Sequence, residues 1–451
     1  MKNLLLLMTI ALGGVTCLAQ QPPPESAKSD RFLFGAQTTF IYQILLHFKS
    51  PYSGGNSLSN QAQGRLSNTY TLYLGARVFP GLEAYVDPEQ SMGAGVGGAV
   101  GLADYTNGEV IRTPTLGQGG GVQEIPQMPY VARAFLRYTL ATGRGLESIA
   151  KGENQIAMKR PTDRLVFTAG KLGVPDIFDQ NNYASSTRTQ FMSWALLNNA
   201  AFDYAADTRG YTEGAALEWI HPIWAARVGA FAMPRVANGP DLDPRLIDSN
   251  ATQAELELHP RFKPSLDRGV VRLLAYRNEA TMGDYAEALA SGSTPPSITA
   301  TRQRGRIKYG FGLNIEQALT DAGDTGLFAR LGWNDGSTES FAYTECDDAV
   351  SLGGQLSGKH WRMPNDTLGL AVNDNGISAL HREYLGAGGT GFLLGDGKLH
   401  YGRETGFEAY YKRKLGQGWE ATLDGQLIVN PGYNQDRGPV PVLSLRVHWE
   451  L

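Results

Sequence analysis

The stretch from Phe32 to Phe48 reads FLFGAQTTFIYQILLHF, and its residues alternate in character. One face carries Phe32, Phe34, Ala36, Thr38, Phe40, Tyr42, Ile44, Leu46 and Phe48, and the other carries Gln37, Thr39, Gln43 and His47. Because successive side chains of a β-strand point to opposite sides of the sheet, this period of two predicts a strand with one apolar and one polar face. A strand of this length suits a wall between lipid and water.

The same alternation closes the chain between Val442 and Leu451, where Leu443, Leu445 and Val447 oppose Ser444, Arg446 and His448. Further segments with this pattern are 69–78, 82–87, 132–140, 164–172, 211–220, 224–233, 253–259, 270–277, 306–316, 327–333, 350–357, 368–372, 407–415 and 419–429. Together they predict an all-β fold of about sixteen strands, an even number within the range of transmembrane antiparallel β-barrels.

The first residues of the chain resemble an export signal. Lys2 precedes a mostly apolar run from Leu4 to Val15, and Ala19 suits a cleavage site, so residues 1–19 are expected to be a signal peptide. Cleavage there removes Cys17 and leaves Cys346 as the single cysteine, which excludes a disulfide within the mature chain. Residues 20–30 are expected to be a flexible linker, and residues 31–451 the barrel.

The composition of the chain excludes several classes of protein. After the signal, no run of 18 or more apolar residues occurs, which excludes a helical membrane protein. The 40 basic and 44 acidic residues nearly balance, so neither nucleic acid nor an anionic lipid surface is expected as a partner. A soluble β-sandwich or propeller also has alternating strands, but no repeat of blade length is found. These features favour the membrane barrel.

The lengths of the connections support this interpretation. If the N-terminus is periplasmic, connections after even-numbered strands should be short turns and those after odd-numbered strands long loops. The short turns near Pro80, Pro222 and Gly416 and the long connections 88–129, 173–210, 234–252, 278–303 and 334–348 obey this rule. The connection 141–163 breaks it. Trp219 and Trp224 flank the turn at Pro222, as an interfacial aromatic girdle requires.

The connection DIFDQNNYASSTRTQFMSWALLNNAAFDYAADTRG (176–210) is too long for a turn and too polar for a membrane span. Thr187 and Gln190 fit a T-x-x-Q capping box, which predicts a short helix starting there with Phe191, Trp194 and Ala195 on one face. A connection of this size is usually functional. We expect it to fold into the lumen and to narrow it, with the candidate pore residues Trp194, Asn198, Asn199, Asp203 and Asp207.

Charged residues on the polar faces of the strands are expected to line the lumen. The strongest candidates are Arg77, Glu83, Tyr85 and Asp87, which lie on neighbouring strands joined by a tight turn, followed by Arg133. The others are Arg137, Arg272, Lys308, Glu316 and Arg330. For any single residue, a solvated lumen side chain paired with a neighbour across the strands is the simpler explanation, whereas the cluster on the neighbouring strands favours a site.

Signals of catalysis or metal binding are weak. The seven histidines are scattered without metal spacing, and no G-x-S-x-G occurs. Gly93, Gly95 and Gly98 match G-x-G-x-x-G outside any βαβ unit. Asp203 and Asp207 would share a helix face, so a barrel enzyme acting on envelope glycans or lipids stays an alternative. We expect no catalytic residue, no metal and no cofactor.

Several blocks resemble the carbohydrate-selective porins of the OprB type. They are FKSPYSGGNSL (48–58), GLEAYVDPE (81–89), NGEVIRTPTLGQ (107–118), RLVFTAGKL (164–172), GLFARLGWNDG (326–336), QLIVNPGYNQDRGPV (426–440) and the 176–210 connection. The resemblance implies a sixteen-stranded outer-membrane barrel that passes monosaccharides by diffusion through a constriction of inward-folded loops. One departure is the final Leu451, because such barrels commonly end in Phe or Trp, a signal for the barrel assembly machinery.

The sequence therefore predicts an outer-membrane porin of a Gram-negative bacterium, passive and selective for monosaccharides such as glucose. A general or anion-preferring porin for small polar solutes is the alternative, because the basic lumen residues would suit it as well. The expected partners are sugars, outer-membrane lipids and the assembly machinery. A monomer and a homo-oligomer both fit the pattern.

Overall fold

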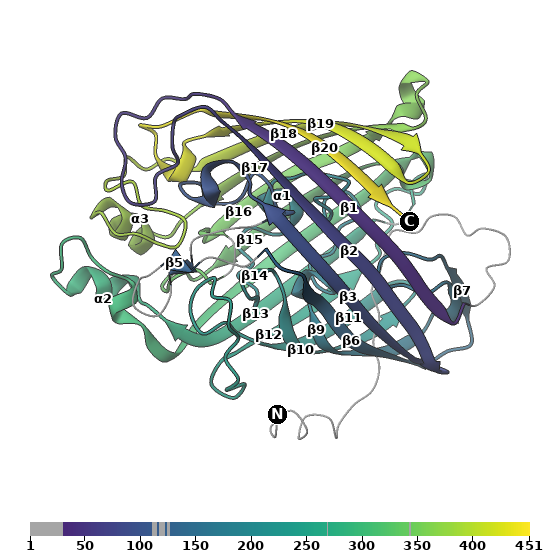
Figure 1. Ribbon diagram of the computed structural model, residues 1–451. Helices are drawn as coiled ribbons and strands as arrows, with labels where there is room; N and C mark the ends of the chain where they lie inside the picture. The colour runs from purple at the N-terminus through teal and green to yellow at the C-terminus, as the bar shows by residue number, and fades with distance from the viewer. Residues whose placement is uncertain (1–29, 111–114, 117–121, 124–126, 268, 342–343) are drawn as a thin grey trace.

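The computed structural model describes residues 30–451 except 111–114, 117–121, 124–126, 268 and 342–343. Sixteen antiparallel strands close into one barrel, in which each pairs with the barrel strands before and after it and β1 pairs with β20 (Figure 1). The signal peptide, Cys17 and nearly all of the 20–30 linker lie outside the described residues. The barrel strands are β1 (Phe32–Leu45), β2 (Gln63–Phe79), β3 (Leu82–Gly93), β6 (Tyr130–Ala141), β9 (Arg164–Leu172), β10 (Thr212–His221), β11 (Trp224–Ala232), β12 (Asn250–Leu258), β13 (Val270–Met282), β14 (Gln303–Thr320), β15 (Thr325–Asn334), β16 (Asp348–Ser357), β17 (Asp366–Gly376), β18 (Glu404–Gly416), β19 (Trp419–Val429) and β20 (Val440–Glu450).

Each segment with alternating residues is a barrel strand, so the predicted fold class and strand number are confirmed. The predicted ends differ by several residues. The strand expected over 368–372 is β17, Asp366–Gly376, and that expected over 306–316 is β14, Gln303–Thr320. The strands extend past the apolar pattern because the backbone ladder continues beyond the lipid-facing band, where polar side chains are tolerated on both faces.

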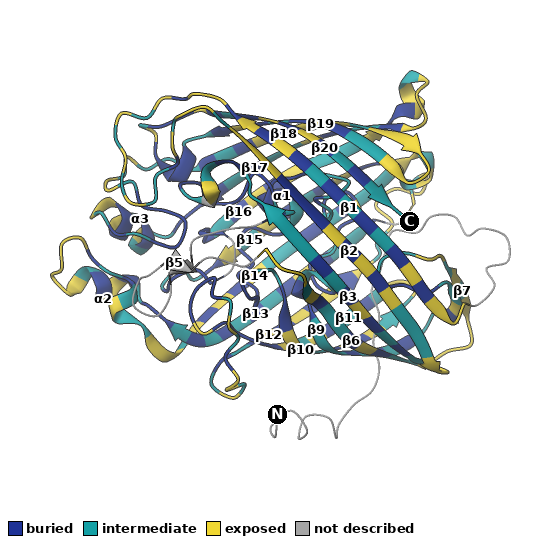
Figure 2. Cartoon of the chain, in the orientation of Figure 1, coloured by how far each residue is buried: buried dark blue, intermediate teal, exposed yellow. Residues whose placement is uncertain are grey.

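The wall shows the expected two faces. Phe34, Leu72 and Leu445 are exposed on the outside, whereas Gln43, Arg330 and Arg446 are buried on the inside. Figure 2 shows this alternation of exposed and buried residues along β1, β2 and β3. Among the described helices, none is long and apolar enough to cross a membrane. The outer face therefore presents an apolar band to lipid, and the inner face forms the polar lining of a lumen.

The two ends of the barrel differ. One end, called here the turn end, carries the short turns, such as that between β10 and β11, where the rings of Trp219 and Trp224 lie 5.1 Å apart. Trp419 and Trp449 lie at the same end, 6.2 Å apart, as members of an interfacial girdle. The opposite end, the loop end, carries the long connections with α2 and α3 (Figure 1).

Short elements occur in the connections. Two small hairpins are β4 (Thr115–Leu116) with β5 (Val122–Gln123) and β7 (Leu146–Ile149) with β8 (Met158–Pro161). The α-helices are α1 (Trp194–Leu197), α2 (Tyr285–Ala290) and α3 (Ala379–Gly386). The 3-10 turns are η1 (Val96–Ala99), η2 (Val174–Asp176), η3 (Thr299–Thr301), η4 (Asp321–Gly323), η5 (Gly358–Trp361) and η6 (Pro431–Tyr433).

The largest buried apolar cluster lies inside the barrel. Phe178, Phe202 and Tyr204 from the connection 173–211, called here the β9–β10 loop, pack with Tyr276 of β13 and Phe231 of β11. In a lipid-embedded barrel the apolar side chains of the strands face outward, so an inner apolar core has to be supplied mainly by the loops. The expectation that this loop folds into the lumen is confirmed.

The prediction that a helix starts at Thr187 is wrong. Residues 187–189 form a turn, and α1 begins only at Trp194. Gln190 accepts a hydrogen bond from the amide of Ser185 at 2.8 Å instead of capping a helix. Phe191 and Trp194 belong to different apolar clusters, because Phe191 contacts the inner wall at Tyr410 (5.0 Å between ring centroids) while Trp194 faces Tyr204 (6.5 Å).

Candidate functional site

The β9–β10 loop is fixed to the inner wall by buried charges. Asp179 pairs with Arg330 of β15 at 3.1 Å, and Asp203 pairs with Lys308 of β14 at 3.1 Å. The side chains of all four residues are at most 3% exposed. Glu408 of β18 accepts the amide of Ser193 at 3.0 Å. Separating such buried pairs leaves an uncompensated charge, so these contacts define one position for the loop.

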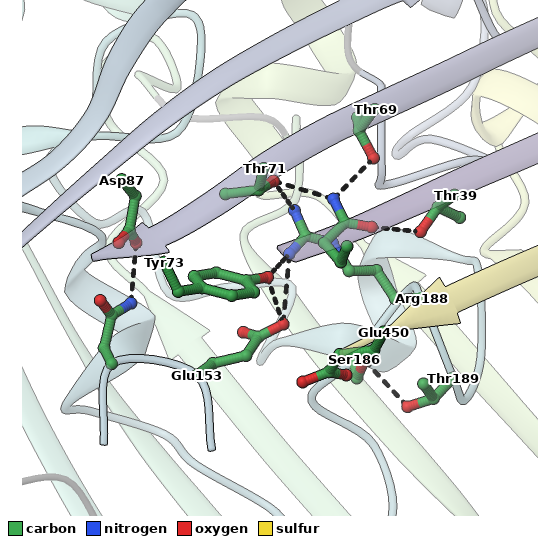
Figure 3. A network of polar contacts seen from close by, with 12 residues as sticks. Thr39, Thr69, Thr71, Tyr73, Asp87, Glu153, Ser186, Arg188, Thr189 and Glu450 are labelled. Atoms are coloured by element: carbon green, nitrogen blue, oxygen red, sulfur yellow. Dashed lines mark hydrogen bonds and ion pairs between the residues drawn. The ribbon is translucent and has the colours of Figure 1, made fainter. Parts of the chain in front are cut away.

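The tip of the loop presents one arginine to the lumen. Arg446 of β20, itself fully buried, donates from Nη1 to the carbonyls of Thr187 at 2.6 Å and Gln190 at 2.7 Å. These bonds hold the turn 187–190 against the wall. Its central residue, Arg188, then extends across the lumen toward β2 and β3 (Figure 3).

Arg188 has five N–H groups, and each finds an acceptor. Its Nε donates to Glu109 at 2.8 Å, its Nη1 to Tyr73 at 2.5 Å and to Glu153 at 3.3 Å, and its Nη2 to Glu89 at 3.1 Å and to Thr71 at 3.4 Å. Burial opposes the charge, but Glu109 and the other acidic neighbours outweigh it and hold the pKa of the Arg188 guanidinium well above its usual value. Arg188 is therefore a permanent cation at the centre of a ring of acceptors.

The partners of Arg188 come from separate parts of the chain. Tyr73 lies on β2, Glu89 lies on β3, and Glu109 lies in the connection 94–129, called here the β3–β6 loop. Glu89 also accepts the hydroxyls of Tyr130 at 2.6 Å and Tyr211 at 3.0 Å. The ring is therefore tied to the wall on one side and to both inward-folded loops on the other.

Glu153 reaches Arg188 from the turn end. It lies between β7 and β8 in the connection 142–163, called here the β6–β9 segment, which had no functional explanation in the sequence. Its Oε1 accepts the Tyr73 hydroxyl at 2.6 Å as well as Arg188. With 38% of its side chain exposed, Glu153 is the most accessible carboxylate paired with Arg188 in the described chain. This segment therefore enters the lumen from the turn end and meets the β9–β10 loop at Arg188.

The two loops also bind each other. The amide of Trp194 donates to the carbonyl of Tyr105 at 3.0 Å, and that of Gly108 donates to the carbonyl of Met192 at 2.9 Å. Asp104 accepts the amide of Ala195 at 3.0 Å, and burial raises the pKa of this carboxyl to about 7 although that amide favours the charged form. The two loops therefore hold each other in place inside the lumen.

The wall residues expected to line the pore form one cluster, but the β6–β9 segment covers them. Asn154 donates to Asp87 at 2.8 Å, and Ile156 packs beside Tyr85, whose ring stacks on Phe135 at 5.1 Å. Tyr85 is 1% exposed, and Asp87 is fully buried. Arg77 lies opposite Glu83 in the β2–β3 register, and Arg133 forms a bidentate pair with Asp176 (2.7 and 2.6 Å). These side chains therefore face inward.

The expected loop residues likewise anchor the loop. Trp194 and Asn198 are buried, and Asn199 donates to the carbonyl of Leu331 at 2.8 Å. Asp203 accepts the amide of Phe341 as well as Lys308, and Asp207 caps its own turn by accepting the amide of Arg209 at 2.9 Å. Of the remaining lumen candidates, Arg137, Arg272, Lys308, Glu316 and Arg330 are all buried on the inner face.

Four residues that the structure brings together were not among the candidates from the sequence: Arg188, Glu89, Glu109 and Glu153. A signal existed for Arg188, which is one of two basic residues between Asp176 and Gly210 and lies inside the pattern interpreted as a capping box. The three glutamates carried no such signal, because each is one polar residue among many in its segment.

Comparisons with known proteins agree with this architecture. The family described as "Carbohydrate-selective porin, OprB family" matches residues 55–451. The high-pH structure of Pseudomonas putida OprB is similar with a TM-score of 0.69 and 15% sequence identity, covering 93% of this chain and 94% of that chain. The channel DcaP of Acinetobacter baumannii gives a TM-score of 0.47 at 10% identity, covering 98% of this chain and 100% of that chain. No curated protein matches the chain.

Proposed function

Because the chain belongs to the carbohydrate-selective porin family and forms a sugar-selective channel of the bacterial outer membrane, we propose that monosaccharides such as glucose diffuse passively past Arg188. The resemblance predicted from the sequence blocks is thereby confirmed. In bacterial barrels of this kind the short turns face the periplasm, so sugars would enter at the loop end and leave at the turn end.

The observation that carries the proposal is the ring of acceptors around Arg188. A sugar offers hydroxyl groups that both donate and accept, so it can exchange hydrogen bonds with the guanidinium, with the Tyr73 hydroxyl and with the accessible carboxylate of Glu153. Charge-assisted hydrogen bonds of this kind are strong enough to select a hydroxylated solute. Each one replaces a bond that already exists, so net binding stays weak, as rapid release requires.

The charges of the lumen disfavour the anion-preferring alternative. Three carboxylates surround the single guanidinium of Arg188. The other basic residues expected to attract anions are neutralised, since Arg133 pairs with Asp176, Arg272 with Glu257 and Glu316, and Lys308 with Asp203. A channel with this balance offers anions little net positive potential.

The enzyme alternative depended on Asp203 and Asp207. Asp203 is 2% exposed and is occupied by Lys308 and by the amide of Phe341. A general acid or nucleophile must reach its substrate, and a carboxylate so enclosed is better explained as an anchor of the loop. We therefore propose a channel without a chemical step.

The test is single-channel conductance in a planar bilayer, titrated with glucose and separately with gluconate. We expect glucose to reduce the ion current of the wild type and Arg188→Ala to abolish most of this block while raising conductance, because the largest side chain of the constriction is removed. Arg245→Ala is the matched control, since Arg245 pairs with Asp243 on the β11–β12 loop. No glucose block of the wild type, together with strong anion selectivity, would refute the proposal.

A further inference from the structure

A cavity of about 410 Å³ lies at the turn end of the lumen, directly beyond the constriction. Its walls are the inner faces of β1, β2, β18, β19 and β20, and Thr189 of the β9–β10 loop and Lys151 of the β6–β9 segment complete it. Tyr73, which binds Arg188, lines the same cavity. A solute that passes Arg188 toward the turn end therefore enters this space.

His448 of β20 places an unused acceptor at the cavity. Its side chain is 3% exposed, and its Nδ1 lies 2.8 Å from Thr39 Oγ1. The hydroxyl of Thr39 already donates its one proton to Gln37 at 2.8 Å, so Nδ1 donates to Thr39, and in this tautomer Nε2 carries the lone pair. Nε2 has no hydrogen-bond partner within the described part of the chain.

Glu450 stands beside this acceptor. Its Oε2 lies 3.6 Å from His448 Nε2, and 40% of its side chain is exposed in the cavity that both residues line. Buried polar atoms are normally satisfied, so an acceptor left open next to a partly exposed carboxylate points to a missing donor. Two neighbouring hydroxyl groups of one solute could donate to the two acceptors at once.

The side chains around the cavity carry charges of both signs. Lys151 and Lys414 supply two ammonium groups, and Glu420 and Glu450 supply two carboxylates. Such a lining offers charged donors and acceptors side by side, which suits a polyhydroxyl compound. The volume lies at the lower end of the range for ligand sites, which fits one monosaccharide and not a longer saccharide.

A chain of hydrogen bonds joins the cavity to the constriction. His448 contacts Thr39, Thr39 donates to Gln37, Gln37 donates to Thr71 at 2.8 Å, and Thr71 donates to Glu89 at 2.7 Å, which pairs with Arg188. Figure 3 shows Thr39, Thr71, Arg188 and Glu450 on this side of the lumen. The fixed polar side chains of β1 and β2 therefore orient both places.

We propose that this cavity is a second binding subsite, on the exit side of Arg188, for the neutral monosaccharide that the channel passes. His448 Nε2 and the Glu450 carboxylate accept hydrogen bonds from adjacent hydroxyls, and Lys414 and Lys151 donate to other oxygens of the sugar. The inference rests on the proposed function. Two weak sites in series let a solute leave the first without returning to bulk water, as conduction through a selective channel requires.

The experiment measures glucose block of single channels in a planar bilayer, with glucose added first to one side and then to the other side of the same channel. The variants are Glu450→Gln and Lys414→Gln. The matched controls are Asp324→Asn and Lys359→Gln, which make the same charge changes at the turn end in an exposed ion pair of 2.7 Å outside the cavity. Heat-modifiable migration in detergent gels checks that each barrel has folded.

We expect both cavity variants to weaken glucose block severalfold from one side only, with the controls behaving as the wild type. If glucose blocks the wild type while the cavity variants match their controls, the exit subsite is refuted and the proposed function stands. If glucose blocks the wild type from neither side, the proposed function fails and the subsite fails with it.

Discussion

The β9–β10 loop and the β6–β9 segment enter the same lumen from opposite ends and meet at the pair of Arg188 with Glu153. They are held very differently. The loop is fixed by ion pairs such as Asp179 with Arg330, whose side chains are at most 3% exposed. The segment is held by the pair of Glu147 with Arg164, in which the Glu147 side chain is 23% exposed, and by the bond from Asn154 to Asp87, and Glu153 itself is 38% exposed.

This difference separates two tasks. Buried ion pairs are costly to break, so the loop is expected to keep one position in the lumen. An exposed pair contributes little to stability, so the charge that the segment presents can change without unfolding the barrel. We therefore expect the loop to form a rigid side of the pore and the segment to form an adjustable side.

The largest effect is expected from removing residues 181–199 of the loop. Without this part, Arg188 and the turn that carries it are lost, so single-channel conductance should rise severalfold and the glucose block should disappear. Removal of residues 263–266, which are mostly exposed at the turn end, is the control and should leave conductance unchanged. An unaltered conductance after the first deletion would mean that the loop does not limit the pore.

Asp179→Ala should produce the next largest effect, on stability. It leaves Arg330 buried without its carboxylate, which costs about 3 to 5 kcal/mol. Thermal unfolding of the purified barrel, followed by heat-modifiable migration, measures the loss. The double variant Asp179→Ala/Arg330→Met removes both charges and should regain much of the stability that the single variant loses. Equal stability of the single variant and the wild type would show that this pair does not hold the loop.

The smallest effects on stability are expected from single substitutions of the two glutamates on either side of Arg188, Glu109 and Glu153. Glu109→Gln alters a buried carboxylate that also accepts Thr187 and Thr69, and should destabilise the loop by about 1.5 to 3 kcal/mol. Glu153→Gln alters a partly exposed carboxylate and should lower the stability by less than about 1 kcal/mol. Both should weaken glucose block. Equal losses of stability would contradict the division into a rigid and an adjustable side.

Much of the fold could be predicted because the decisive constraint is local. The pleat of a strand forces neighbours such as Leu443 and Ser444 to opposite faces, and lipid on one side then requires the apolar member to point outward. The inward position of Arg77, Glu83, Tyr85, Asp87 and Arg133 followed from the same rule. The burial of these side chains beneath Asn154 and Ile156 could not be predicted in this way, because it depends on a connection far away in the sequence.

The turn around Arg188 shows why local rules failed at the site. Thr187 and Gln190 have the spacing of a capping box, yet the Thr187 hydroxyl donates to Glu109 of another loop at 2.8 Å, and Arg446 of β20 takes the carbonyls that a helix would have used. Tertiary hydrogen bonds to buried charged groups are stronger than the cap they replace.

The sequence by itself determined a sixteen-stranded membrane barrel with polar loops in its lumen, because a period of two and the lengths of the connections are properties of neighbouring residues. The tertiary structure alone decided which polar side chains meet in the pore. Arg188, Glu89, Glu109 and Glu153 belong to four separate segments, and they come together because three connections, folded inward from opposite ends, meet against the same stretch of wall.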